Sequence, residues 1–254
     1  MLCFYILIAL QIVVESLPIS SSSHVHLLEL GMRGVPLPSS LMYALHIPTA
    51  IVLALFFCRR WLFMVSHVRV CAPILFKLCV LGAIVDGITA FFFVVFHYMP
   101  VTLPLGVGLC ITAIALYSLP FCVSRNVSFG YSQALMLGLA QGIALLPGIS
   151  RFALVYAIAR WLGINHRRTF EITWLVEFPL IIAASFLSLY LDGGKQMCAL
   201  LTDPLALCEM IVASIIAYVA LYFMERLAAR NYLWLLSFYM IIPLTVWVYL
   251  ARVR

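Results

Sequence analysis

Charged residues are scarce in this sequence. Asp, Glu, Lys and Arg together make up 9% of the 254 residues, whereas 66% are hydrophobic, and the mean hydropathy is +1.16. A soluble domain of this length could not bury so much apolar surface. The composition therefore excludes a soluble globular protein and indicates an integral membrane protein.

The alternating ten-residue segments of an outer-membrane barrel are also missing. The apolar runs are long and helix-sized, and helices satisfy their backbone hydrogen bonds within the segment. The net charge of +6 does not indicate nucleic acid as a partner, because the basic residues lie between apolar runs, where the positive-inside rule explains them. We expect an all-α integral membrane protein in a lipid bilayer, with no nucleic-acid partner.

Cysteine pairs with the spacing of a metal or redox motif are absent. The eight cysteines are scattered through apolar stretches without a C-x-x-C pair, and a metal or redox motif would need such a pair. We therefore expect them to act as small apolar packing residues.

Six apolar runs are long enough to cross a membrane, at residues 41–58, 73–97, 104–122, 169–191, 205–224 and 233–250. A shorter broken segment precedes each group of three, at 1–31 and 131–163. The starts of the second three runs follow those of the first three by 128, 132 and 129 residues. The sequence predicts one membrane domain made of two repeats, 1–128 and 129–254, each a re-entrant helical hairpin plus three spans.

Lysine and arginine in the short loops predict one consistent cytoplasmic side. The supporting residues are Arg59, Arg60, Arg69, Arg125, Arg160, Arg167, Arg168, Arg226 and Arg230, and only Arg252 and Arg254 disagree. Because each unit contains an odd number of full spans, the second hairpin would enter from the opposite side. This predicts an inverted-topology repeat in which the two breaks converge near the midplane.

The first break is the most polar stretch of the chain, Gln11-Ile-Val-Val-Glu15-Ser-Leu-Pro18-Ile-Ser20-Ser-Ser-Ser-His24. Gln11 and Glu15 share one helical face, and a carboxylate is costly in lipid unless it faces a cavity, a cation or a basic partner. Glu15, with Gln11 beside it, is a candidate ligand for magnesium or calcium together with substrate phosphate. His24 could be a general acid, a general base or a nucleophile, and Ser21 a nucleophile that His24 activates. The alternative is a polar pair that holds helices together.

The second break, Pro147-Gly148-Ile-Ser150-Arg151, has the same outline of proline and serine. Ser20 and the serines after it can cap a restarting helix, whose free N–H groups favour an anion. Gly148 allows close backbone approach, Ser150 repeats the cap, and Arg151 offers a charged fork to phosphate oxygens. The alternative for Arg151 is a residue that reaches the cytoplasmic interface. The two breaks together predict a site for phosphate or pyrophosphate.

Both breaks resemble motifs of one family. The run from Gln11 to His24 is similar to the [E/Q]-x-x-x-E motif, and the serine/histidine segment after it, of undecaprenyl-diphosphate phosphatases of the bacitracin-resistance type. The run from Pro147 to Arg151 resembles the first half of that family's P-G-x-S-R-S-x-x-T motif, and residues 170–179 also fit.

The resemblance implies an enzyme of the bacterial cytoplasmic (inner) membrane. It would hydrolyse undecaprenyl diphosphate to undecaprenyl phosphate, the carrier lipid of cell-wall synthesis, with a divalent metal ion. It would act as a homodimer whose site opens to the periplasmic side. Position by position, Glu15 matches the second acid of the first motif, Ser21 and His24 the proposed nucleophile or proton-transfer pair, and Ser150 and Arg151 the phosphate-binding turn.

The chain also departs from the pattern. The serine and threonine expected after Arg151 are Phe152 and Val155, so two hydroxyls that could contact phosphate are missing. Glu177 lies within the fourth predicted span, where the family is apolar, and its cost there indicates a partner or a wet face. For three further histidines we expect no more than a hydrogen bond to a neighbour: His26, His46 and His97.

Two other functions remain open. Inverted repeats with broken helices and polar groups at the midplane are also the plan of alternating-access transporters, so a lipid-phosphate transporter or flippase is one. A non-catalytic member that only binds the lipid is the other. Release of phosphate from a prenyl diphosphate distinguishes the enzyme from both.

Overall fold

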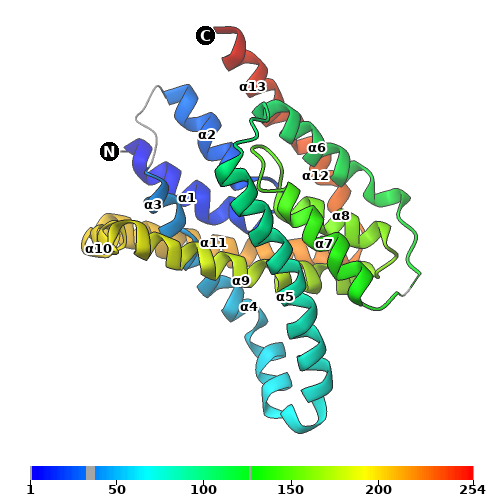
Figure 1. Ribbon diagram of the computed structural model, residues 1–254. Helices are drawn as coiled ribbons and strands as arrows, with labels where there is room; N and C mark the ends of the chain where they lie inside the picture. The colour runs from blue at the N-terminus through cyan, green and yellow to red at the C-terminus, as the bar shows by residue number, and fades with distance from the viewer. Residues whose placement is uncertain (1, 33–37, 126, 254) are drawn as a thin grey trace.

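The computed structural model of the protein describes residues 2–32, 38–125 and 127–253. Within these ranges the regular structure consists of α-helices and short 3-10 turns, with no strand. This confirms the all-α class. Figure 1 shows how the helices pack around one another, with α4 (His46–Ser66) and α5 (Val68–Tyr98) forming a long hairpin that extends beyond the rest.

The first half of the chain begins with a broken helix. Its two arms are α1 (Leu2–Glu15) and α2 (Ser21–Met32), and Pro18 lies between them. Proline lacks the N–H that would continue the helix, which explains the break. The remaining elements before the second half are α3 (Ser39–Ala44), α4, α5, α6 (Leu105–Tyr117) and the 3-10 turn η1 (Leu119–Phe121).

The second half also begins with a broken helix, formed by α7 (Tyr131–Ile143) and α8 (Arg151–Trp161). Ser150 caps α8, because its hydroxyl oxygen accepts a hydrogen bond from the Ala153 N–H at 3.3 Å. The elements that follow are α9 (His166–Asp192), α10 (Lys195–Thr202), α11 (Pro204–Ala229), the 3-10 turn η2 (Leu233–Leu235), α12 (Leu236–Tyr239) and α13 (Ile241–Val253).

Five segments in the described ranges are long and apolar enough to cross a membrane: Ser39–Ser66, Val68–Tyr98, His166–Asp192, Pro204–Ala229 and Leu233–Arg252. The chain is therefore a multi-pass membrane protein. The prediction of a sixth full span at 104–122 is not confirmed. There α6 has only 13 residues, a rise of about 20 Å against a hydrocarbon core of about 30 Å. Pro104 precedes it, and Pro120 lies in the 3-10 turn that follows.

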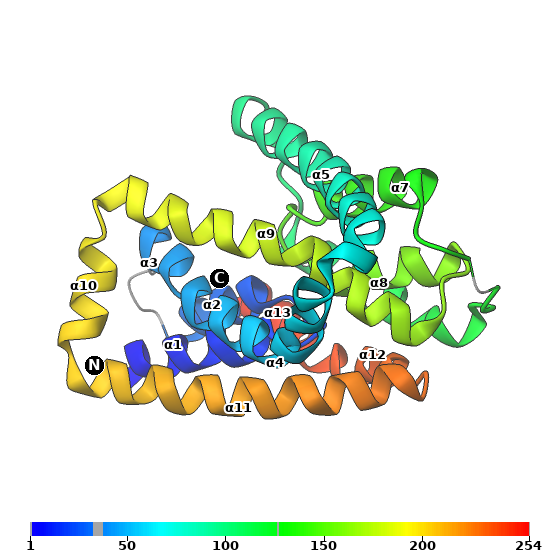
Figure 2. The same cartoon turned by 90° about the horizontal axis from the view of Figure 1, so that it is seen from below.

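The long helices enclose the first broken helix. Figure 2 shows α9 and α11 on opposite sides of α1, α2 and α4, with α10 joining them at one end. Helix α1 packs along α11, α4 packs along α9, and α5 packs along α7. The first break is therefore held inside the bundle, where a polar tip at membrane depth has to lie.

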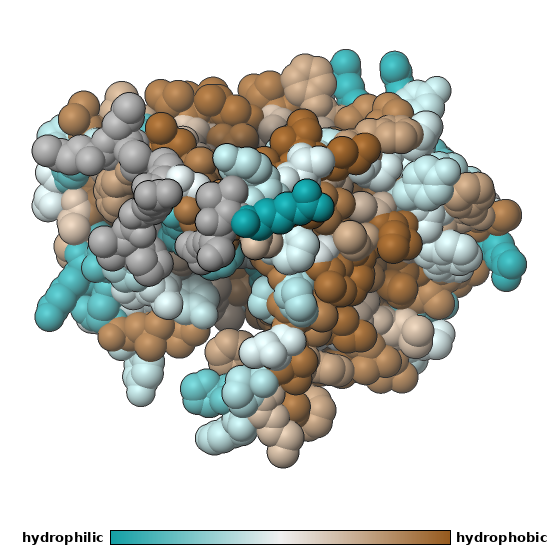
Figure 3. Space-filling model, turned by 90° about the horizontal axis from the view of Figure 1, so that it is seen from above, coloured by the Kyte–Doolittle hydropathy of each residue, from teal (hydrophilic) through white to brown (hydrophobic). Residues whose placement is uncertain are grey.

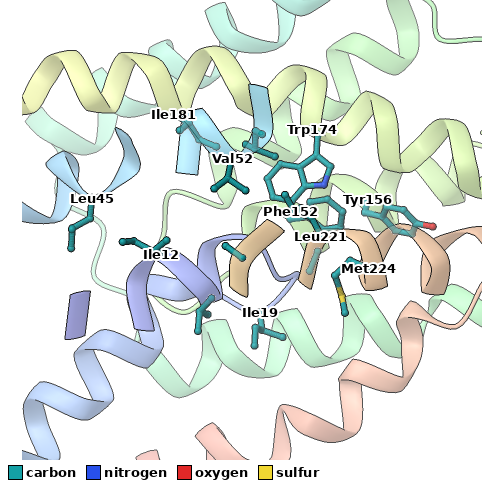
Figure 4. Packing of buried hydrophobic residues seen from close by; sticks show 14 of the residues in the cluster. Ile12, Ile19, Leu45, Val52, Phe152, Tyr156, Trp174, Ile181, Leu221 and Met224 are labelled. Atoms are coloured by element: carbon teal, nitrogen blue, oxygen red, sulfur yellow. The ribbon is translucent and has the colours of Figure 1, made fainter. Parts of the chain in front are cut away.

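A large cluster of buried apolar side chains joins the two halves. Figure 4 shows its members converging from the first broken helix, α4, α8, α9 and α11, among them Ile12, Ile19, Val52, Phe152, Trp174 and Leu221. In a bilayer the neighbouring lipid is as apolar as these residues, so close van der Waals packing is what favours their contact.

The outer surface is largely apolar. Figure 3 shows brown, hydrophobic atoms over much of one face, with hydrophilic atoms in scattered groups. Large side chains on the long helices stay exposed, such as Phe76 at 74% and Ile215 at 61%. Such a surface suits lipid rather than water. The seven cysteines whose side chains are described are all free, and one of them, Cys122, is buried.

Candidate functional site

The two breaks touch each other. Arg151 at the start of α8 donates a hydrogen bond from Nη2 to Glu15 Oε1 at the end of α1, at 3.0 Å. The residues are 136 positions apart, and the side chains are 22% and 7% exposed. The two breaks that the sequence predicts to converge are thus in contact through a part-buried ion pair.

Both carboxylate oxygens of Glu15 are engaged. Oε2 accepts hydrogen bonds from Gln11 Nε2 at 3.1 Å and from the hydroxyl of Ser21. Oε1, besides its bond from Arg151, lies 3.5 Å from His46 Nδ1. Four side chains from α1, α2, α4 and α8 therefore surround this carboxylate, which makes a charge tolerable at membrane depth.

The first break is folded by its own hydroxyls. Ser16 Oγ donates to the Val13 carbonyl at 2.7 Å and ends α1, and the hydroxyls of Ser20 and Ser23 lie 2.6 Å apart. Helix α2 then begins at Ser21. This local sequence leaves Ser21, the first residue of the new helix, turned towards Glu15.

The second break is held instead by α6. Gly148 has a φ of +89°, and a Cβ there would lie 2.4 Å from the carbonyl oxygen of Leu105. Thr112 Oγ1 accepts from the Ser150 N–H at 2.8 Å and donates to the Gly148 carbonyl at 3.1 Å. Close backbone approach at Gly148 therefore serves the contact with α6, and it fixes where α8 begins.

A cavity of about 710 Å³ opens beside the Glu15–Arg151 pair. The polar part of its lining is Gln11, Glu15, Ser20, Ser21, Ser22, Tyr43, His46, Thr89, His97, Ser150, Arg151 and Glu177. The apolar part comes mainly from α3, α5 and α9, with residues such as Met42, Phe93, Phe96, Leu180 and Leu187. A ligand that fits this lining has a charged head group and an apolar chain.

Six of the eight residues that the sequence singles out line this cavity: Gln11, Glu15, Ser20, Ser21, Ser150 and Arg151. Gly148 does not line it, because its contacts are with α6. His24 also lies outside the lining. Its Nδ1 is 2.8 Å from the Ser20 carbonyl oxygen, its Nε2 is 3.2 Å from the Tyr239 hydroxyl, and its ring stacks on Tyr239.

The hydroxyl of Ser21 bonds to Glu15 rather than to His24. The sequence-based idea that His24 activates Ser21 therefore does not match the contacts of this arrangement. The two residues remain neighbours, three positions apart on the same face of α2.

His46 was missed as a member of the site. The sequence predicts for His46 only a hydrogen bond to some neighbouring residue. The structure places its ring beside Glu15, with 8% of the residue exposed. Its partner lies 31 positions away in the chain on another helix. Only tertiary packing brings the two together, so no local pattern could have indicated it.

The two hydroxyls missing after Arg151 have been replaced by core packing. Phe152 is 4% exposed, and its ring centroid lies 4.8 Å from Trp174 and 5.7 Å from Tyr156 and from Phe170. Val155 is fully buried in a second apolar cluster. Arg151 is thus the one side chain after Ser150 through which the start of α8 offers charge to the cavity.

Oxygen donors in the cavity suit magnesium or calcium, which prefer carboxylate and carbonyl ligands. Gln11 Oε1 is buried without a hydrogen-bond partner and is therefore available as a ligand. Both oxygens of Glu15, in contrast, already accept hydrogen bonds. Within the described ranges no group of three or more His, Cys, Asp or Glu residues is placed to hold a metal. The residues fit a hard cation only when substrate oxygens complete its shell, as is usual for magnesium.

Comparison with known proteins places the chain. The family model for bacitracin resistance protein BacA matches residues 4–245. The chain is 30% identical over 194 residues to an undecaprenyl-diphosphatase of Borrelia hermsii, covering 70% of this chain and 72% of that protein. It is 26% identical over 228 residues to one of Desulforudis audaxviator, covering 85% of each, and 27% identical over 232 residues to one of Campylobacter concisus, covering 84% and 85%. The chain therefore belongs to the bacitracin resistance protein BacA family.

Proposed function

We propose that this protein is an enzyme that hydrolyses undecaprenyl diphosphate to undecaprenyl phosphate and inorganic phosphate. Its family and the names of its relatives support this assignment. The observation that carries it is the part-buried Glu15–Arg151 pair beside a cavity with a polar and an apolar lining. A prenyl diphosphate has the matching parts, a highly charged head and an apolar tail.

The head group binds between the two breaks. Arg151 offers further guanidinium N–H donors besides the one bonded to Glu15. The N-termini of α2 and α8, at Ser21 and Arg151, add free backbone N–H groups and a favourable dipole. Ser20 and Ser150 lie at these same two starts and line the cavity.

In the reaction, an oxygen nucleophile attacks the terminal phosphorus and the bond from that phosphorus to the bridging oxygen breaks. The bridging oxygen leaves with the lipid as undecaprenyl phosphate, and water supplies the oxygen and protons of the released phosphate. Glu15 accepts a hydrogen bond from Ser21, so it is placed to take a proton from the serine hydroxyl or from a water in its place. His46 lies beside Glu15 and helps to hold the carboxylate in position.

His24 retains its proposed part in proton transfer. His24 lies about one helical turn after Ser21, and its ring contacts the Ser20 carbonyl oxygen and the Tyr239 hydroxyl. Direct exchange with the head group requires its side chain to leave Tyr239 for another rotamer, a change of the order of one hydrogen bond, about 1 kcal/mol.

We propose a divalent cation, magnesium or calcium, as cofactor, with Gln11 and Glu15 as the candidate ligands given by the sequence. Bound there with substrate oxygens, the cation would neutralise charge on the diphosphate. The prenyl tail lies against the apolar lining from α3, α5 and α9. The proposed setting is the bacterial cytoplasmic membrane, with two re-entrant hairpins in an inverted repeat, a site open to the periplasm, and a homodimer.

The test is release of inorganic phosphate from undecaprenyl diphosphate by the purified protein in detergent with magnesium, calcium or manganese. We expect turnover by the wild type and a loss of about 10²-fold to 10³-fold in Arg151→Ala, because one charged donor to the phosphoryl group disappears. No release with any of these metals, together with transfer of undecaprenyl phosphate across liposomes, would instead make the protein a lipid-phosphate transporter. Binding of the lipid without either activity would make it a non-catalytic member.

A further inference from the structure

Glu177 is a buried carboxyl group without a protein partner. It lies within α9, is 4% exposed and lines the same cavity as Glu15 and Arg151. Its Oε1 is shielded and accepts no hydrogen bond, and Glu177 takes part in no hydrogen bond or ion pair with any residue in the described ranges. A buried acceptor with no donor is costly, so this oxygen is expected to meet a ligand that supplies positive charge or a proton.

The charges around Glu177 do not balance. Arg151 on α8 and Glu15 on α1 act on it electrostatically, and these two already form an ion pair with each other. A second carboxylate therefore adds a negative charge to a cavity whose one guanidinium is shared. A diphosphate would bring still more negative charge, so a bare Glu177 carboxylate would repel the substrate proposed above.

A divalent cation resolves both difficulties. Magnesium and calcium take hard oxygen ligands, and magnesium is usually held by one or two carboxylates with substrate phosphates and waters. Glu15 has both oxygens in hydrogen bonds, whereas Glu177 has an oxygen free. We propose that Glu177, in place of the fully hydrogen-bonded Glu15 that the sequence indicates, is the carboxylate through which this protein holds the divalent cation that accompanies the diphosphate head group. This inference builds on the proposed function, and it concerns a residue outside both sequence motifs.

The test compares binding with and without metal. A non-hydrolysable prenyl diphosphonate, in which a methylene group replaces the bridging oxygen, is titrated into the purified full-length protein by calorimetry. We expect magnesium at about 5 mM to tighten binding to the wild type about tenfold or more. In Glu177→Gln the shape is kept and the charge is lost, so this enhancement should vanish while metal-free binding stays equal or becomes tighter.

Glu209→Gln is the matched control. This carboxylate lies on α11 and does not line the cavity, so its removal should leave the magnesium enhancement intact. Thermal unfolding of the wild type and of every variant in the same detergent checks that each is folded. Glu177→Ala is the second variant, in case the glutamine amide itself retains the metal, and it should also lose the enhancement.

Three outcomes overturn the inference. If Glu177→Gln and Glu177→Ala keep the magnesium enhancement, the cation is held elsewhere. If the wild type binds the diphosphonate equally with and without magnesium, Glu177 faces the head group as a neutral acid. If the wild type binds no diphosphonate under either condition, the proposed function fails with it, whereas the first two outcomes leave that function standing.

Discussion

The two broken helices have the same outline but contribute differently to the cavity. The first break supplies the polar side chains, Gln11, Glu15 and Ser21, which bond to one another at the cavity wall. The second supplies one charge, from Arg151, and its backbone is fixed by Thr112 of α6. Two segments of similar pattern can thus divide a site between them. One carries most of the polar side chains, and the other carries a guanidinium group held in a fixed position.

The difference between the two breaks also explains why apolar residues rather than hydroxyls follow Arg151. On the first break the residues following the turn are hydroxyls, and three of them reach the cavity, namely Ser20, Ser21 and Ser22. On the second break the corresponding stretch turns into the aromatic cluster around Phe152. Where the family motif has hydroxyls, at positions 152 and 155, this chain therefore has apolar side chains whose packing anchors α8 against α9.

A hydroxyl at position 152, where the family motif has one, is expected to have the largest effect on stability. Phe152→Ser removes an aromatic ring packed against Trp174 and Phe170, so we expect the free energy of unfolding to fall by about 3 to 5 kcal/mol. Unfolding in detergent followed by tryptophan fluorescence measures it, with Phe223→Ser as a control because Phe223 is 55% exposed on α11. A folded Phe152→Ser protein with higher activity would show that the position still belongs to the phosphate site.

A methyl group at Gly148 tests whether the second break depends on α6. Gly148→Ala places a Cβ 2.4 Å from the Leu105 carbonyl oxygen at a positive φ, which should cost about 2 to 4 kcal/mol from strain and overpacking. Gly87→Ala on α5 is the matched control, because a Cβ there meets nothing within 4 Å. We expect it to be neutral or stabilising by up to about 1 kcal/mol. Equal thermal unfolding of the two variants would contradict the proposed role of this contact.

The hydroxyl of Thr112 tests the same support with a smaller change. Thr112→Val leaves the Ser150 N–H and the Gly148 carbonyl without this partner, which should cost about 1 to 3 kcal/mol. Ser185→Ala on α9 is a buried control whose hydroxyl bonds only within its own helix, to Ile181, and which does not line the cavity. We expect Thr112→Val also to lower kcat/KM, because it loosens the start of α8. If the two variants behave alike, the bonds between α6 and the break are not needed to position Arg151.

Much of this arrangement could be predicted from the sequence, because its cause is local. Pro18 and Pro147 interrupt apolar helices, and serines follow each proline, so both breaks and the cap of α8 by Ser150 could be predicted. The charge of Glu15 predicted a cavity, a cation or a basic partner, but the sequence assigned Arg151 to phosphate oxygens and did not predict its ion pair with Glu15.

Other features depend on tertiary structure and could not be predicted. His46 meets Glu15 only because α4 packs beside the first break. The ring of His24 contacts Tyr239 of α12 rather than Ser21, and nothing in the α2 sequence decides between these two partners. The run at 104–122 is apolar enough for a span, but the flanking prolines and the 3-10 turn leave its helix short.

The central claim is that the two breaks form one composite site, and a double-mutant cycle tests it most directly. Glu15→Gln, Arg151→Gln and the double variant are compared by kcat/KM for phosphate release from undecaprenyl diphosphate. We predict that each single variant loses about 10²-fold to 10³-fold, and that the double variant loses no more than the worse single one, because the pair acts as a unit. Losses that multiply in the double variant would contradict the claim and place the two residues at independent sites.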